Sequence, residues 1–167
     1  MKNYFSLGNS IYPYLLLNMR SGASFIRVDG PNNYRRVAGT SIGVSLLWGI
    51  SRYMGLFKDP TELCAAAVRG DSSKVDMSVG DIYGGDYKGL NLPMDMIASS
   101  FGRVQNVEDT HEINKDDIAR SLVTLVAANN VIFSKIIAQT EKIKRVIWIG
   151  SHIDTLEYMQ MSESAFA

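Results

Sequence analysis

The stretch YPYLLLNMRSGASFIRVDGPNNYRRVAGTSIG, residues 12–43, decides the fold, because short apolar runs alternate in it with tight turns. Its first run, Tyr14–Met19, contains three consecutive leucines bounded by turn residues, the pattern of a strand covered on both faces. The expected elements are strands at 14–19, 23–29 and 34–37 and turns at 20–22, 30–33 and 38–43. The stretch therefore predicts a central β-hairpin extended by a third strand.

Two turns in this stretch combine small residues with hydroxyl groups. Arg20-Ser21-Gly22 follows the first strand, and Gly39-Thr40-Ser41-Ile42-Gly43 leads into an apolar segment that is predicted to be a helix. Free N–H groups and the positive end of the helix dipole meet at such a helix start, which favours an anion. Turns of this composition are also common as plain connections between strands. The residues alone leave a phosphate site and simple turns open.

The rest of the chain predicts helices that cover this hairpin. The expected elements are helices at about 41–54, at 60–68 after Asp59, at 75–79 and at about 115–139 after Asn114, an apolar element at 97–101 and a strand at 146–149. Residues 1–11 form a poorly patterned lead-in, residues 103–112 an exposed connection, and residues 151–161 a candidate helix. The 167 residues are expected to form a single α/β domain.

The segment 115–139 is expected to be the longest helix, with apolar residues along one face. That face is formed by Ile118, Leu122, Leu125, Asn129, Ile132 and Ile136. Val126, Phe133 and Ile137 widen the stripe beyond what one neighbour covers. A core helix packed on the sheet and a self-association surface both explain the pattern. Asn129-Asn130 in mid-helix needs hydrogen-bond partners if it is buried.

Composition excludes several classes of function. The 17 Lys and Arg residues balance the 17 Asp and Glu residues, so no global charge attracts nucleic acid or an anionic membrane. No apolar run approaches the ~18 residues of a membrane span, and the N-terminus lacks the apolar core of a signal peptide, so a cytoplasmic protein is expected. Cys64 is the one cysteine, which excludes an intrachain disulfide. His111 and His152 stand in no set of ligands, so no metal site is expected.

Five segments of the chain resemble the eukaryotic-type (type II) pantothenate kinases, members of the superfamily of acetate and sugar kinases, Hsp70 and actin. They are YPYLLLNMRSGAS with NYRRVAGTSIG, RGDSSKVDMSVGDIYGGDY at 69–87, IASSFG at 97–102, NKDDIARSLVTLVAANN at 114–130 and KRVIWIG at 144–150. DIYGGDY together with ASSFG is the most specific part. The resemblance covers nearly the whole chain. It implies the second, C-terminal half of an actin-like ATPase or sugar kinase (ribonuclease H-like) fold, with a mixed sheet and a long helix near residues 115–139.

The same resemblance implies that ATP, with Mg²⁺, phosphorylates pantothenate in the first step of coenzyme A synthesis. The positions that it assigns are Ser21, Ser24, Arg36, Tyr83, Tyr87 and Ala98 on the substrate side, and Gly39, Thr40, Ser41, Gly43 and Gly150 on the nucleotide side. Arg36 matches the arginine that holds the pantothenate carboxylate, a role that suits the fork of guanidinium donors. Arg35 beside it is expected to be a solvated charge. Without the resemblance, the tyrosines and Ala98 would fit ordinary core packing.

Three departures from the family fall on the nucleotide side. Arg20 stands where the family has a glycine before the phosphate-loop serine, Val44-Ser45 replaces glycines, and Ser151-His152 replaces the turn after the last strand. Side chains at 44 and 45 are expected to restrict φ > 0 conformations and to fill space near a nucleotide. The catalytic carboxylate and the first phosphate loop of the family, with its metal-associated aspartate, have no counterpart in the sequence.

Two functions follow as hypotheses. The first is an ATP-dependent pantothenate kinase of which this chain is an incomplete half, inactive by itself. The second is a non-catalytic protein that binds pantothenate or a coenzyme A-type ligand, or that pairs with an active kinase as a regulatory subunit. The resemblance also implies a homodimer or heterodimer through the 115–139 helix, and coenzyme A or acyl-CoA as a regulator.

Overall fold

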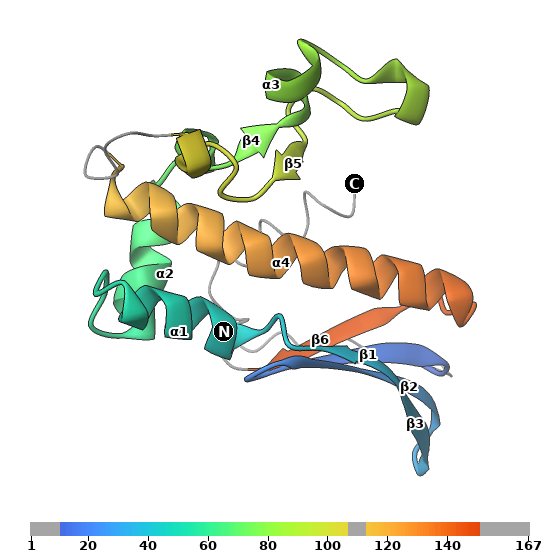
Figure 1. Ribbon diagram of the computed structural model, residues 1–167. Helices are drawn as coiled ribbons and strands as arrows, with labels where there is room; N and C mark the ends of the chain where they lie inside the picture. Colours follow the sequence, from blue (N-terminus) through green and yellow to red (C-terminus); the bar gives the residue numbers. More distant parts are fainter. Residues whose placement is uncertain (1–10, 107–112, 151–167) are drawn as a thin grey trace.

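The computed structural model describes residues 11–106 and 113–150. A four-stranded sheet lies on one side of a long helix, α4, and a small lobe formed by residues 71–106 lies on the other side (Figure 1). The candidate helix at 151–161, His111 and His152 fall outside the described residues.

The sheet draws three of its four strands from residues 14–40. Its strands are β1 (Tyr14–Met19), β2 (Ala23–Gly30), β3 (Asn33–Thr40) and β6 (Val146–Gly150), in the order β3-β2-β1-β6. β1 and β3 each pair antiparallel with β2, and β6 runs parallel to β1. These strands confirm the predicted hairpin, its third strand and the strand predicted at 146–149. β3 is longer than predicted, because its backbone stays paired with β2 as far as Thr40, opposite Ala23.

The two faces of the sheet are not equally covered. Leu15 and Leu17 of β1 are 0% exposed, whereas Leu16 between them is only half-buried. Successive side chains of a strand point to opposite faces, so only the face toward α4 is closed by the described residues. The prediction of a strand covered on both faces therefore holds for one face in this part of the chain.

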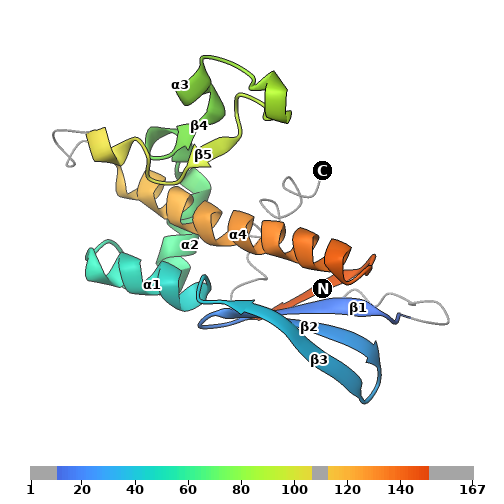
Figure 2. The same cartoon turned by 45° about the vertical axis from the view of Figure 1, so that its right-hand side comes forward.

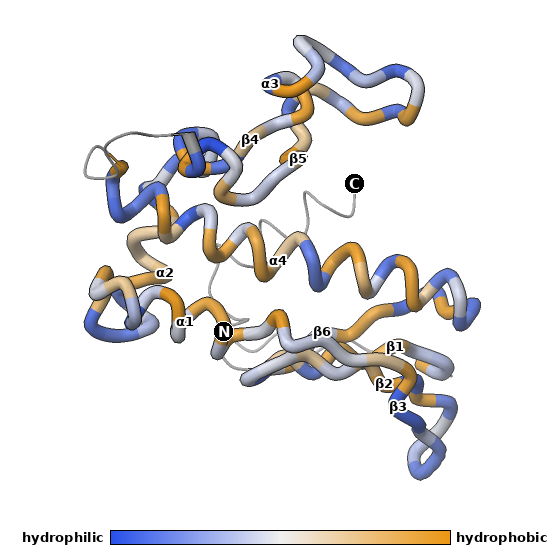
Figure 3. The backbone as a smooth tube through the Cα atoms, viewed as in Figure 1, coloured by the Kyte–Doolittle hydropathy of each residue, from blue (hydrophilic) through white to orange (hydrophobic). Residues whose placement is uncertain are grey.

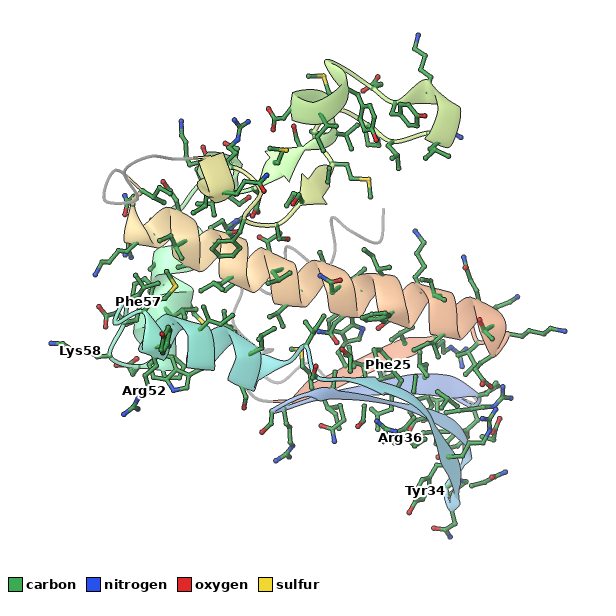
Figure 4. All side chains as sticks on the ribbon, in the orientation of Figure 1. Phe25, Tyr34, Arg36, Arg52, Phe57 and Lys58 are labelled. Carbon is green, nitrogen blue, oxygen red and sulfur yellow. The ribbon has the colours of Figure 1, made fainter. Side chains whose placement is uncertain are left out.

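The helix α4 (Lys115–Thr140) begins and ends within one residue of its predicted bounds. The Asn114 side chain accepts a hydrogen bond from the Asp116 N–H (3.0 Å), and this cap starts the helix as expected. Phe25 of β2 packs edge-to-face against Phe133, with ring centroids 6.4 Å apart, between the sheet and the helix (Figure 4). The buried face of α4 thus closes the core on the side opposite the sheet.

Apolar residues recur along the whole of α4 (Figure 3). By length and composition it is the one helix in the described ranges that could cross a membrane, although 50% of its most apolar window is buried inside the protein. This helix does not contradict the prediction of no membrane span, because polar Ser, Thr and Asn residues interrupt its apolar runs and half of its most apolar window is buried. Its packing on the sheet and on α2 (Pro60–Arg69) identifies it as a core helix.

Two shorter helices flank one end of α4 (Figure 2). α2 starts as predicted, because the Asp59 side chain accepts a hydrogen bond from the Glu62 N–H (2.9 Å) and Pro60 occupies the first turn. α1 (Val44–Tyr53) begins about three residues later than predicted. The delay arises because Gly43 is in an extended conformation, so the small-residue turn precedes the helix instead of forming its first turn.

The small lobe is built from short elements. They are 3₁₀ turns at Ser72–Lys74, Lys88–Leu90 and Val104–Asn106, strands β4 (Met77–Ser78) and β5 (Ile97–Ser99), and helix α3 (Val79–Tyr83). The helix predicted at 75–79 is wrong, because Met77 and Ser78 pair with β5 and Ser78 then caps α3 in a reciprocal capping box with Asp81. Asp76, 3% exposed, accepts hydrogen bonds from the Phe101 N–H and the Ser121 hydroxyl, which ties the lobe to α4.

Candidate functional site

The predicted nucleotide-side residues gather at one edge of the sheet. Gly150 pairs with Met19, Met19 with Ala23, and Ala23 with Thr40, so the ends of all four strands form one row. The Arg20–Gly22 turn leaves this row between β1 and β2. The Gly39–Gly43 turn, whose first two residues are the last two of β3, leads from the row into α1. The sheet topology therefore brings together turns that lie about twenty residues apart in sequence, and Gly150 with them.

The two turns are in direct contact. A Cβ atom on Gly22 would lie 2.7 Å from the Thr40 carbonyl oxygen, a distance that real Cβ atoms do not reach. The Val44 N–H donates to the Arg20 carbonyl (2.8 Å), and the Ser45 N–H donates to the Ser21 carbonyl (3.2 Å). Glycine at position 22 is thus required by the close approach of backbone to backbone.

These bonds change the predicted anion site. Two N–H groups at the start of α1 are not free, because those of Val44 and Ser45 donate to carbonyls of the Arg20–Gly22 turn. The prediction that the helix start itself offers free donors is therefore wrong for these two groups. Hydrogen-bond partners across 20 residues cannot be read from a local pattern. The Ser21 and Ser41 side chains remain exposed at this edge.

Val44 and Ser45 also lie differently from expectation. Both belong to the first turn of α1, and neither has a positive φ. The expected conflict between their side chains and φ > 0 conformations therefore does not arise. Gly150 does have a positive φ, 152°, as the last residue of β6.

A second cluster lies on the face of the sheet opposite α4. Ser24 alternates with the buried Ala23 and Phe25 and so points away from the helix. The Arg36 Nε donates to the Ser24 hydroxyl at 3.4 Å. A Cβ atom on Gly39 would lie 1.8 Å from Arg36 Nη2, so the missing side chain at 39 makes room for the guanidinium. The half-buried Ser24 and the exposed Arg36 and Gly39 thus form one group beside the turn edge.

Arg36 and Arg35 have different environments although they are neighbours. In the described ranges, Arg36 has no carboxylate partner, which leaves its guanidinium available to an anion. Arg35 bonds the Glu141 carboxylate at 2.6 Å, on the side of α4. The Arg35 side chain is 59% exposed, so it is solvated as predicted, but the sequence did not show that it pairs with Glu141. Alternation along the strand sends the two side chains to opposite faces.

Arg35 belongs to a charged network that closes the far end of the sheet. Arg27 donates to Asp29 (2.9 Å) and to the Glu141 carbonyl (2.7 Å). The hydrogen bond from Arg27 holds the pKa of Asp29 below its ordinary value, and the two carboxylates raise the pKa of Arg27. This network fixes the β2–β3 hairpin to the end of α4, away from the turn edge.

The structure separates Tyr83, Tyr87 and Ala98 from the other predicted substrate residues. The two tyrosine rings stack at 4.5 Å in the small lobe, and Ala98 is an exposed residue of β5. The lobe lies across α4 from β3 and the labelled Arg36 (Figures 1 and 4). Tyr83 is 56% and Tyr87 38% exposed, so ordinary core packing does not explain them.

The described residues do not fit a magnesium site. Among them, no group of three or more His, Cys, Asp and Glu side chains is placed to hold a metal ion. In its described part, the turn edge carries hydroxyls, glycines and Arg20 but no carboxylate. Any ion on a nucleotide at this edge would need ligands from elsewhere.

One residue of this site is not among the predicted site residues. Asn130 of α4, 0% exposed, donates from its Nδ2 to the Ile42 carbonyl at 2.9 Å. The sequence does carry a signal, because an asparagine pair interrupts an apolar helix and must find partners. It does not show where the partner lies.

Comparison with known proteins identifies the family. The chain matches the family described as Fumble over residues 2–167. It is 39% identical over 147 residues to pantothenate kinase 2 of Arabidopsis thaliana, which covers 87% of this chain and 16% of that protein. It is 35% identical to the pantothenate kinase of Schizosaccharomyces pombe over 145 residues, 85% of this chain and 36% of that one. The chain therefore spans well under half the length of these relatives.

Solved structures show the same fold at low identity. The xylulose kinase from Bifidobacterium adolescentis aligns over 87% of this chain and 30% of its own, with a TM-score of 0.55 and 14% identity. The glycerol kinase of Plasmodium falciparum, solved with ADP, aligns over 89% of this chain and 33% of its own, with a TM-score of 0.55 and 12% identity. These likenesses confirm the predicted fold class: α/β, with the mixed sheet and long helix of the actin-like kinases. The sequence match over nearly the whole chain decides the family, and the chain belongs to the Fumble family of pantothenate kinases.

Proposed function

We propose that this chain forms the part of an ATP-dependent pantothenate kinase that holds pantothenate and one side of the nucleotide. The observation that carries the proposal is the group Ser24, Arg36 and Gly39 beside two contacting turns at one edge of the sheet. A guanidinium without a carboxylate partner suits the pantothenate carboxylate. Hydroxyls at Ser21 and Ser41 and the glycine-rich edge suit a phosphate chain. The product would be 4'-phosphopantothenate, in the first step of coenzyme A synthesis.

The chain by itself is proposed to bind ligand without turning over ATP. Phosphoryl transfer needs a metal ion and a group that orients or deprotonates the attacking hydroxyl. The described part of the turn edge offers no carboxylate for either role. The missing parts would come from a segment outside this chain, as the short span of the match to its relatives suggests. A non-catalytic pantothenate- or CoA-binding subunit is the alternative, favoured by Arg20 in the phosphate turn.

Self-association through α4 is the second part of the proposal. Ile132 and Ile136 are 47% and 53% exposed, and Leu125 is half-buried in the same stripe. Leu122, expected in this stripe, is 1% exposed and belongs to the core instead. Self-association would also account for the separation of Tyr83 and Tyr87 from Arg36. A pocket that uses both sets needs the small lobe of a second copy to reach the sheet across an α4–α4 contact.

Cellular location and regulation follow from the family alone. A cytoplasmic enzyme regulated by coenzyme A or acyl-CoA is proposed on this ground, with ATP and Mg²⁺ as the cofactors of the complete kinase. Nucleic acid and membranes are not proposed partners, because the charges of the chain balance.

The test is calorimetry with pantothenate on the parent chain, on Arg36→Ala and on Arg35→Ala. Arg35→Ala is the matched control, since it removes the same side chain from the opposite face. Loss of a charge-assisted pair worth roughly 1.5–3 kcal/mol predicts at least tenfold weaker binding by Arg36→Ala alone. Equal binding by the three proteins would remove Arg36 from its role. A parallel assay measures ATP consumption, and pantothenate-dependent consumption by this chain would refute its inactivity.

A further inference from the structure

Asn130 is fully buried near the middle of α4 and bonds in two directions. Its Nδ2 donates to the Val126 carbonyl of its own helix (2.8 Å) and to the Ile42 carbonyl (2.9 Å), 88 residues earlier in the chain. Both acceptors are carbonyl oxygens, so the amide must present its NH₂ group to them. The orientation of this side chain therefore follows from its surroundings.

Ile42 stands inside the turn that leads from β3 into α1. Its N–H donates to the Thr40 hydroxyl (3.1 Å), and the N–H groups of Val44 and Ser45 donate to the Arg20 and Ser21 carbonyls. These bonds join the two turns to each other. Within the described residues, the hydrogen bond from Asn130 joins the pair of turns to α4.

Packing alone does not explain an asparagine at position 130, because a buried amide stabilises the fold less than an apolar side chain would. Its Oδ1 is buried and has no hydrogen-bond partner among the described residues. An unpaired buried acceptor destabilises a fold, whereas an apolar residue of similar volume would fill the same space without that cost. A leucine at position 130 would fill the same space but would lose the hydrogen bond to the Ile42 carbonyl.

We propose that Asn130 is a positioning residue: it holds the Gly39–Gly43 turn, and through it the Arg20–Gly22 turn, in the geometry that receives a phosphate chain. The phosphate role of the turns rests on the proposed function, and the anchoring itself does not. Asn130 touches no ligand in this proposal and acts only through the carbonyl of Ile42.

The neighbouring residue supplies a matched control. Within residues 11–106 and 113–150, the Asn129 Nδ2 donates only to the Leu125 carbonyl of its own helix (2.8 Å), and its side chain is half-buried. Asn129→Ala therefore removes the same amide from the same helix without touching the turn.

The first test is amide hydrogen exchange on the parent, Asn130→Leu and Asn129→Ala. Loss of one buried hydrogen bond predicts exchange faster by a factor on the order of ten at Ser41–Ser45 and Arg20–Gly22 in Asn130→Leu. The centre of β2 and α2 should keep their protection, and Asn129→Ala should match the parent at the turns. A uniform rise over the whole protein, or equal behaviour of the two variants, would overturn the proposal.

A measurement on the parent keeps the test open if Asn130→Leu does not fold. Nuclear Overhauser contacts are expected between the Asn130 side-chain amide protons and the Ile42 and Gly43 backbone protons. Their absence in the folded parent would overturn the anchoring.

The second test separates positioning from mere stability. Inorganic triphosphate is titrated into the ¹⁵N-labelled proteins while the amides of Ser21, Thr40 and Ser41 are followed. Asn130→Leu should bind about tenfold more weakly than the parent and Asn129→Ala. Pantothenate binding through Arg36 should change less than triphosphate binding. A parent that does not bind triphosphate refutes the phosphate role of the turns, and hydrogen exchange still decides whether Asn130 anchors them.

Discussion

Gly22 and Gly43 lie back to back where the two turns meet, so closely that a Cβ atom on Gly43 would lie 2.6 Å from the Gly22 Cα atom. Neither glycine has a positive φ, so their requirement is steric and does not depend on a left-handed backbone. The contact joins the end of β1 to the start of α1. Whatever binds at this edge meets both turns as one unit.

Gly43→Ala should therefore lower the free energy of unfolding. The new methyl group meets backbone atoms that cannot rotate away, and overpacking of this kind costs about 1–3 kcal/mol. Urea unfolding measures the change. Gly49→Ala in α1 is the control, since nothing lies within 4 Å of its added Cβ and alanine favours a helix by up to ~1 kcal/mol. Equal destabilisation by both substitutions would contradict the steric account.

Asp76→Ala should loosen the small lobe from α4. The buried carboxylate accepts from the Phe101 N–H and the Ser121 hydroxyl, and both donors lose their partner in the variant. Unpaired buried donors cost about 1–3 kcal/mol. Unfolding measurements should show this loss, while the exposed Asp95→Ala changes stability by less than about 0.5 kcal/mol. A neutral Asp76→Ala would mean that the lobe is held by other contacts.

Acid should weaken the end of the sheet that Asp29 closes. Its pKa is lowered in the folded protein, chiefly by the hydrogen bond from Arg27. A depressed folded pKa gives stability that is present above the unfolded pKa of about 3.9 and is lost as pH falls through the folded pKa. Melting temperatures between pH 2 and pH 7 should therefore fall less steeply below about pH 4 in Asp29→Asn than in the parent. Parallel acid limbs would show that Asp29 contributes nothing there.

A charge on the exposed stripe of α4 should dissociate a dimer. Ile136→Glu places a carboxylate on a residue that is 53% exposed, so the monomer fold should tolerate it while an apolar interface should not. Sedimentation velocity should give a dimeric parent and a monomeric variant. Val68→Glu on α2, also a half-exposed apolar residue, should leave the parent's state unchanged. A monomeric parent would refute the proposed α4 interface. Leu125 is a less clean site, because a charge on its half-buried side chain also disturbs folding.

Local patterns in the sequence determined most of the elements. The leucine run, the turn residues and the β-branched strands gave the hairpin, and Asn114, Asp59 and Pro60 placed two helix starts to within a residue. These signals are readable because a strand repeats every two residues, a helix about every 3.6, and a cap acts within three. The motifs from Arg20 to Gly43 and from Asp81 to Tyr87 likewise indicated the family from sequence alone.

Only the tertiary structure decided what those elements do to each other. Strand alternation about a bulge sent Arg35 to Glu141 and Arg36 to Ser24. In the folded chain, the Val44 and Ser45 N–H groups of α1 donate to the Arg20–Gly22 turn, and Asn130 donates to the Ile42 carbonyl. The lobe that carries Tyr83 and Tyr87 lies across α4 from β3, which carries Arg36. Each of these contacts joins residues that share no local period. Their pairing depends on where the sheet and the helix finally pack, which no single stretch of sequence encodes.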